Sequence, residues 1–175
     1  FRSWTDQESD AFFTRHFYRA VLQKIFLDKW VISRVYHGET ASAATPFNSS
    51  TNPVIIGSLR KQCYTSFNAY VRGAITKLTT HPDFSQYHQV IQEKMGDITD
   101  EEIASYEETF RYRKRELSAV WSLMAFSACV VESVIVTDRW LFLREHSDIV
   151  CDCWVETVFD YKQSPRNLVV VGIKR

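Results

Sequence analysis

Apolar residues recur at helical spacing in the first thirty or so residues of the chain. Residues 5–8 have the Thr-x-x-Glu form, in which the hydroxyl and the carboxylate satisfy free backbone N–H groups at a helix start. The residues that follow place one apolar stripe three or four positions apart: Phe12, Phe13, Phe17, Val21 and Ile25. The pattern predicts a first helix that ends near Trp30.

Three further helices are predicted in the middle of the chain. Residues 58–78 carry apolar side chains three or four apart, with the cations largely on the other face. Residues 84–94 repeat this pattern over a shorter length. A second Thr-x-x-Glu sequence at residues 99–102 begins a long helix that runs to about residue 145. We expect a kink or break in that helix near Arg115.

The last part of the chain predicts two strands. Residues 150–159 alternate between two faces, and residues 168–173 form a continuous β-branched run. Residues 160–167 are too many for a tight two-residue turn, and we expect the strands to pair antiparallel. Because a two-stranded ribbon is marginal alone, we expect these strands to complete a larger sheet, whose other strands lie upstream of Phe1.

Residues 37–57 show no apolar period and contain Pro46, Pro53 and many small polar residues, which predicts a flexible loop. A length of 175 residues favours one domain or a part of one. We therefore expect a single partial domain with four regions: a first helix region (residues 1–36), the flexible loop (residues 37–57), a helical insertion (residues 58–115), and a long helix with a closing β hairpin (residues 116–175).

Residues 119–136 form an apolar run of nearly membrane-spanning length. Glu132 lies inside this run, and a carboxylate near the centre of a membrane helix costs about 2.5 to 3.5 kcal/mol. Asp138 and Arg139 follow closely. The pattern favours a buried helix of a globular protein, and we expect no membrane partner.

The net charge and the cysteines bear on the partners and the cellular location of the protein. Lys and Arg together number 21, as do Asp and Glu, so the net charge does not demand a polyanionic partner. The cysteines are Cys63, Cys129, Cys151 and Cys153. Two of them have apolar neighbours, which is typical of reduced thiols and favours a cytoplasmic or nuclear location.

Cys151, Cys153 and His146 raise the hypothesis of a zinc site, since thiolates and imidazole are zinc ligands. A structural zinc ion needs four ligands, and no second pair has a suitable spacing. The sequence favours cysteines that pack in the core, and no metal site is predicted.

Glu132 has two interpretations. It is either a carboxylate of a functional site or the buried partner of an arginine such as Arg19 or Arg139. A buried carboxylate without a partner is costly, so pairing is the favoured hypothesis.

Two segments mix cations with aromatic residues, as nucleic-acid-binding surfaces do. One is RYRKR at residues 111–115, and the other is the predicted helix that carries Arg60, Lys61, Tyr64, Phe67, Tyr70 and Arg72. Ordinary amphipathic helices show the same mixture. Because the acidic residues 97–108 precede RYRKR, mutual screening of charges along one helix is favoured.

Several pieces of the sequence occur in the order typical of a known family. They are FYRAVLQ in the first helix, a variable loop, a helix with Tyr-Val, a long helix with V-E-x-x-I-x-x-D-R, the sequence F-D-x-x-x-S-P-R-N, and a final hydrophobic strand. In these pieces the chain resembles the methyltransferase-like protein 25 family of S-adenosylmethionine-dependent methyltransferases. The matching positions include Val131, Glu132, Asp138, Arg139, Phe159, Asp160, Ser164, Pro165, Arg166 and Asn167.

The resemblance implies an α/β fold: the C-terminal part of a class I, Rossmann-like methyltransferase, here mostly helical with a C-terminal antiparallel strand pair. It implies that upstream segments bind S-adenosylmethionine, and no cofactor-binding motif or catalytic residue is identified in this chain. Enzymes of similar layout act on RNA, so analogy favours an RNA acceptor. The alternative is a non-catalytic helical interaction module or a degenerate methyltransferase scaffold.

The resemblance also implies that the segment after the first strand lies on the substrate side of the sheet, beyond the carboxyl ends of the strands. Pro165 fixes the backbone and presents its neighbours stiffly. We predict four substrate-binding residues: Tyr161, Ser164, Arg166 and Asn167. In the alternative interpretation, Arg166 and Asn167 bond to nearby carbonyls and hold the crossing loop.

Overall fold

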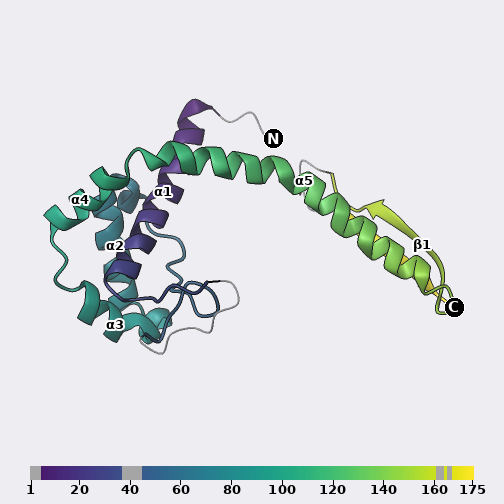
Figure 1. The fold of residues 1–175 in the computed structure, drawn as a ribbon, viewed down its shortest axis with the longest axis horizontal. Helices are drawn as coiled ribbons and strands as arrows, with labels where there is room; N and C mark the ends of the chain where they lie inside the picture. Colours follow the sequence, from purple (N-terminus) through teal and green to yellow (C-terminus); the bar gives the residue numbers. More distant parts are fainter. Residues whose placement is uncertain (1–4, 37–44, 161–163, 165–166) are drawn as a thin grey trace. The chain divides into compact units, whose positions relative to one another are not determined.

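The computed structural model describes residues 5–36, 45–160, 164 and 167–175. The chain divides into two compact units, Phe1–Ser118 (unit 1) and Ala119–Arg175 (unit 2). The described elements, labelled in part in Figure 1, are α1 (Asp6–Asp28), the 3₁₀ helix η1 (Lys61–Tyr64), α2 (Phe67–Thr80), the 3₁₀ helix η2 (Pro82–Phe84), α3 (Ser85–Met95), α4 (Asp100–Phe110), α5 (Arg113–Glu145), β1 (Val150–Thr157) and β2 (Leu168–Lys174). The helix α5 begins in unit 1 and continues through unit 2.

The helix α1 begins and ends with distinct caps. The backbone N–H of Glu8 donates to Thr5 Oγ1 at 3.2 Å, and the N–H of Thr5 donates to Glu8 Oε2 at 2.9 Å, which confirms the predicted capping box. At the other end Trp30 has φ 56°, in the left-handed region. The N–H of Val31 then donates to the carbonyl of Phe26 at 2.9 Å, as in a helix-terminating turn.

Helices α1 to α4 share one core in unit 1. Side chains spaced three or four residues apart on each helix face the same interior, as the periodicity predicts. The fully buried members include Leu22, Ile25 and Phe26 of α1, Phe67, Val71 and Leu78 of α2, Ile91 and Met95 of α3, and Ile103 of α4. Residues predicted as a helical insertion thus pack directly against the first helix.

The described part of the predicted loop also contributes to this core. Phe47, Val54 and Ile56 are buried in it. The side-chain oxygen of Asn48 accepts hydrogen bonds from the N–H groups of Ser50 and of Thr51, at 2.9 and 2.7 Å. Residues 37–44 of the predicted loop lie outside the described residues.

The second helix begins later than predicted. Residues 58–66 are not α-helical: they contain η1, and α2 starts after Ser66, whose Oγ accepts from the N–H of Ala69 at 3.1 Å. A Cβ added at Gly73 would lie 2.5 Å from Cys63 Sγ. The absence of a side chain at Gly73 therefore lets η1 pack closely on α2, which a continuous helix would not allow.

The helix break predicted near Arg115 is confirmed. The helix α4 ends at Phe110 and α5 begins at Arg113. Thr99 caps α4, since its Oγ1 accepts from the N–H of Glu102 at 3.2 Å. The shorter helix predicted at residues 84–94 is also confirmed as α3.

The antiparallel strand pair predicted for the end of the chain is confirmed in unit 2. Cys153 pairs with Gly172, and Val155 pairs with Val170. The helix α5 covers the hairpin: Trp140 Nε1 donates to the carbonyl of Cys153 at 3.3 Å, and a Cβ at Gly172 would lie 3.0 Å from Leu143 Cδ1 (Figure 1). Gly172 therefore permits a close approach of helix and strand.

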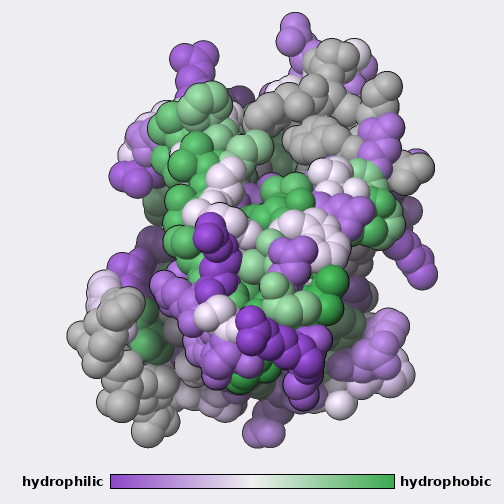
Figure 2. Space-filling view, turned by 90° about the vertical axis from the view of Figure 1, so that its right-hand side faces the viewer, coloured by the Kyte–Doolittle hydropathy of each residue, from purple (hydrophilic) through white to green (hydrophobic). Residues whose placement is uncertain are grey.

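The prediction that the apolar helix is buried is wrong for this chain. No residue of α5 is buried, and Leu123 and Phe126 are 66% and 74% exposed. By length and composition α5 also qualifies as a helix able to cross a membrane. The face of the molecule in Figure 2 shows hydrophobic residues, in green, at the surface. The reason for the exposure of α5 is that, among the described residues of unit 2, the hairpin is the one element that packs on it.

Candidate functional site

The structure describes two of the four predicted substrate-binding residues, Ser164 and Asn167. Tyr161 and Arg166 lie outside the described residues. Asn167 is 9% exposed, and its Nδ2 donates to the carbonyl of Phe159 at 2.9 Å. The carbonyl of Asn167 accepts from the N–H of Val158 at 2.8 Å. Asn167 thus holds the two ends of the crossing loop together.

These bonds are those that the alternative interpretation expects of Asn167. The N–H of Ser164 donates to the carbonyl of Asp160 at 3.1 Å, which fixes the loop at a second point. Val158 and Phe159 are more than half exposed beside these bonds. The hairpin end therefore presents apolar side chains next to a hydrogen-bonded loop, and substrate binding by the four residues stays a prediction.

Among the described residues, Glu132 does not form the predicted pair with Arg139, while its pairing with Arg19, a residue of unit 1, stays a prediction. Glu132 is half-buried on α5 rather than buried. Arg139 lies seven residues further along the helix, a rise of about 10 Å. That spacing is longer than the three or four residues at which side chains on one helix are neighbours.

The cysteines of the hairpin do not belong to a core. Cys151 is exposed, Cys153 is half-buried, and both thiols are free. The strand register is irregular between Val150 and Asp152, so Cys151 falls out of the alternation on which the prediction rested. In the part of the chain that the structure describes, no group of three His, Cys, Asp or Glu side chains is placed to hold a metal ion.

The cations and aromatic residues of the predicted cation–aromatic helix do not share one surface. Phe67 and Tyr70 are buried in the core. Arg72 points to the start of α4, where its Nε donates to Asp100 Oδ1 at 3.0 Å and lowers the pKa of that carboxyl together with Asn68. Only the residues of η1 and its cap, which lie outside α2, keep their cations exposed.

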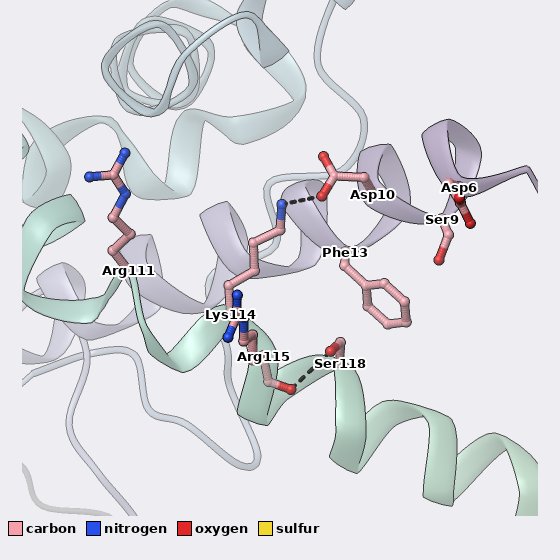
Figure 3. Close-up of a pocket in the computed structure, with 8 residues that line it drawn as sticks. All are labelled: Asp6, Ser9, Asp10, Phe13, Arg111, Lys114, Arg115 and Ser118. Atoms are coloured by element: carbon pink, nitrogen blue, oxygen red, sulfur yellow. Dashed lines mark hydrogen bonds and ion pairs between the residues drawn. The ribbon is translucent and has the colours of Figure 1, made fainter.

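A cavity of about 490 Å³ lies in unit 1 between the start of α1 and the start of α5 (Figure 3). Its lining residues are Asp6, Ser9, Asp10, Phe13, Arg111, Lys114, Arg115 and Ser118. Lys114 Nζ donates to Asp10 Oδ1 at 2.7 Å and to Thr14 Oγ1 at 2.8 Å. This contact lowers the pKa of Asp10, through the hydrogen bond first and the charge of Lys114 second.

Most of the charge in this cavity is compensated. Arg111 Nη1 lies 3.2 Å from Glu108 Oε2, and Lys114 is neutralised by Asp10. Arg113, next to the cavity, lies 3.9 Å from Glu116. The screening predicted for RYRKR is therefore present, although part of it comes from α1. Sequence reasoning missed Asp10 because it lies 104 residues from Lys114 and no local pattern joins them.

The described glycines do not form a cofactor cradle. Gly73 and Gly172 allow close packing, Gly96 lies at a helix end, and Gly57 has φ 66°. None of them follows a parallel strand, because the described sheet is an antiparallel pair. The described residues do not provide the glycine-rich turn after a parallel strand in which class I methyltransferases hold S-adenosylmethionine.

The chain is similar to two curated proteins, both named "Probable methyltransferase-like protein 25", one from Mus musculus and one from Homo sapiens. Each is 30% identical to this chain over 159 residues, which is 91% of this chain. The chain spans 21% of the length of each relative. These similarities confirm the resemblance seen in the sequence. No family model and no solved structure matches the chain.

Proposed function

We propose that this chain is a part of an S-adenosylmethionine-dependent methyltransferase and that it supplies the last two strands of a Rossmann-like sheet. The observation that carries the proposal is the 30% identity to methyltransferase-like proteins over 91% of the chain. Since the chain spans about a fifth of those relatives, the remaining sheet and the cofactor site belong to other parts of the polypeptide.

The geometry of unit 2 supports this role. A hairpin of two strands is marginal in water without further strands or helices, and α5 is the one described element of unit 2 that packs on it. Val169 and Ile173 of β2 remain 43% and 47% exposed. We propose that neighbouring strands pair with the hairpin and that the apolar surface of α5 packs on the same sheet rather than in a bilayer.

We propose that the helical unit 1 shapes the access of the substrate in the full-length protein. Its helices have their own buried core, so it does not need the sheet to bury apolar surface. An RNA acceptor is the substrate class we propose, by analogy with enzymes of similar layout. All four cysteines are free, which fits a cytoplasmic or nuclear location.

Isothermal titration calorimetry with S-adenosylmethionine tests the proposal. We expect the full-length polypeptide to bind the cofactor and the 175-residue chain to bind none, because the described residues lack a cradle for it. Tight binding by the 175-residue chain alone would overturn the proposal that other parts of the polypeptide hold the cofactor.

A full-length protein that folds but binds no S-adenosylmethionine would favour the scaffold alternative, in which unit 1 is a non-catalytic interaction module. If the full-length protein does bind S-adenosylmethionine, methyl transfer to RNA is measured with the radiolabelled cofactor. Transfer to protein or to a small molecule, with none to RNA, would contradict the acceptor class and leave the methyltransferase assignment standing.

A further inference from the structure

The described cations of unit 1 fall into two groups, those that pair with an acid and those that do not, and Arg34, Lys77 and Arg115 belong to the second group. The first group pairs with acids within ion-pair distance and comprises Lys24, Lys29, Arg72, Lys94, Arg111, Arg113 and Lys114. Among the described residues, Arg15, Arg19, Arg60 and Lys61 also have no such partner, and all four are exposed. The positive charge of unit 1 is therefore unevenly compensated although the whole chain is neutral.

Four of the cations without an acidic partner, Arg15, Arg19, Arg60 and Lys61, belong to two elements, α1 and η1 with its cap, that meet at a pair of tyrosines. Arg15 Cζ lies 5.1 Å from the centre of the Tyr64 ring, and the rings of Tyr64 and Tyr70 lie 5.6 Å apart. Arg19 is four residues after Arg15, on the same face of α1. Its charge acts on the buried Tyr70 hydroxyl, where it opposes the rise in pKa that burial causes.

The other two cations come from η1. Arg60 is the cap of η1 and Lys61 is its first residue, on the same short helix as Tyr64. The position of η1 is fixed by the close packing of Cys63 on Gly73 and by a hydrogen bond of 3.4 Å from the N–H of Leu59 to the Tyr64 hydroxyl. Two separate elements, α1 and η1, thus contribute cations near one aromatic ring: Arg15 lies over the Tyr64 ring, and Arg60 and Lys61 come shortly before Tyr64 in the chain.

This arrangement is unfavourable without a ligand. Like charges four residues apart on a helix, such as Arg15 and Arg19, destabilise it by about 0.2 to 0.5 kcal/mol. A polyanion would relieve that repulsion. The guanidinium of Arg15 is planar, lies over the Tyr64 ring and belongs to an exposed residue, so a second planar group can approach it. Phosphates suit the cations, and bases suit the stacked guanidinium.

We propose that Arg15, Arg19, Arg60, Lys61 and Tyr64 form a basic–aromatic face that binds single-stranded RNA. The choice of RNA rests on the proposed function, while the single-stranded preference rests on the stack of Arg15 on Tyr64. The basic–aromatic face would hold the methyl acceptor by its phosphates and would stack one base on Arg15.

Fluorescence anisotropy of the 175-residue chain with a labelled oligouridylate of about 12 nucleotides, a usual site length, tests the proposal. The variant Arg15→Glu/Arg60→Glu is compared with Lys94→Glu/Arg113→Glu, which changes the charge equally outside the basic–aromatic face. We expect an affinity loss of at least about tenfold in the first variant and less than about twofold in the second, each contact being a phosphate contact. Equal losses in both variants would overturn the proposal.

Two further measurements sharpen the test. Four phosphate contacts predict a slope of log affinity against log salt of about −2.8, and two contacts predict about −1.4. Arg15→Lys keeps the charge and removes the planar group, so we expect an unchanged slope and a smaller preference for single-stranded over duplex RNA. An unchanged preference would contradict the stack. Circular dichroism checks the fold, and Arg15→Gln/Arg60→Gln replaces the first variant if that one unfolds.

The outcomes separate this inference from the proposed function. RNA binding that depends on the basic–aromatic face, in a protein that transfers no methyl group, would support the face and contradict the enzyme. Methyl transfer with no RNA binding would support the enzyme and contradict the role of the basic–aromatic face. Binding to phosphatidylserine vesicles, without binding to RNA, would assign the face to a membrane surface and overturn the proposal.

Discussion

The side-chain amide of Asn167 donates a hydrogen bond of 2.9 Å to the backbone carbonyl of Phe159 across the loop that joins β1 and β2. The backbone of Asn167 also accepts from Val158 at 2.8 Å. One residue therefore extends the strand pairing by a step and closes the loop with its side chain. The loop on which substrate residues are predicted depends on this closure.

Replacing Asn167 by Asp should loosen the hairpin end. Asp has nearly the same shape but no N–H donor, so the carbonyl of Phe159 loses its partner, at a cost of about 1 to 3 kcal/mol. We expect faster hydrogen exchange at the Val158 amide, measured by NMR. Ser127→Ala, which removes a hydroxyl bonded within α5, is the control. Unchanged exchange at Val158 would show that the side chain does not hold the loop.

Replacing Gly73 by Ala should destabilise unit 1. The new methyl group would lie 2.5 Å from Cys63 Sγ, and overpacking of this kind costs about 1 to 3 kcal/mol. In a Cys63→Ala background the same change should cost much less, because the sulfur is gone and the nearest remaining atom is the Cβ of residue 63 at 3.2 Å, while Ala favours a helix over Gly by about 1 kcal/mol. Urea unfolding followed by circular dichroism measures both. Equal destabilisation in the two backgrounds would refute the contact between η1 and α2.

The stability of unit 1 should fall at alkaline pH through Tyr106. Burial raises the pKa of Tyr106 to about 12, and the hydrogen bond of 3.0 Å from its hydroxyl to Asp28 adds to the rise. Because the folded pKa lies above the unfolded value of 10.0, the contribution is complete below pH 10 and is lost as pH rises toward 12.

NMR titration of the Tyr106 ring checks this. Asp28→Asn should bring the pKa of Tyr106 closer to 10 without restoring it fully, since burial remains. Asp83→Asn, which removes an exposed carboxylate that does not contact Tyr106, should leave the titration unchanged. A Tyr106 ring that titrates near its ordinary value in the unaltered chain would contradict the burial of its hydroxyl.

Leu123→Glu/Phe126→Glu should have opposite effects in two contexts. In the 175-residue chain both positions are exposed, so we expect less self-association and less hydrophobic dye binding, with unit 1 unfolding unchanged. In the full-length protein we expect destabilisation, because the charges would be buried against the sheet.

Analytical ultracentrifugation and thermal unfolding measure the two effects. Gln86→Glu/Gln89→Glu adds the same charge at exposed positions of α3 and serves as the control. A full-length protein that tolerates the changes in α5 would show that this surface is not covered by the rest of the polypeptide.

Local patterns predicted most of the elements. The capping residues Thr5 and Thr99 and the alternation in β1 led to the correct helix starts and to the antiparallel pair. These features depend on interactions between residues close in sequence. The start of α2 was mispredicted because the apolar period continues through η1, while the helix itself starts only at the cap Ser66.

The candidate site was less predictable. Three contacts join residues that are distant in sequence: Asp10 with Lys114, Arg72 with Asp100, and Arg15 with Tyr64. No periodicity encodes which charges will meet. The mixture of cations and aromatics was visible in the sequence, but the members that share one surface were not.

The sequence by itself determined the helices, the strand pair and the resemblance to methyltransferase-like proteins, because caps, periodicity and ordered motifs are properties of neighbouring residues. Only the tertiary structure decided which cations are neutralised, that α5 stays uncovered in this chain, and that Asn167 closes its loop. Those outcomes depend on packing between distant segments, which sets burial and charge pairing together.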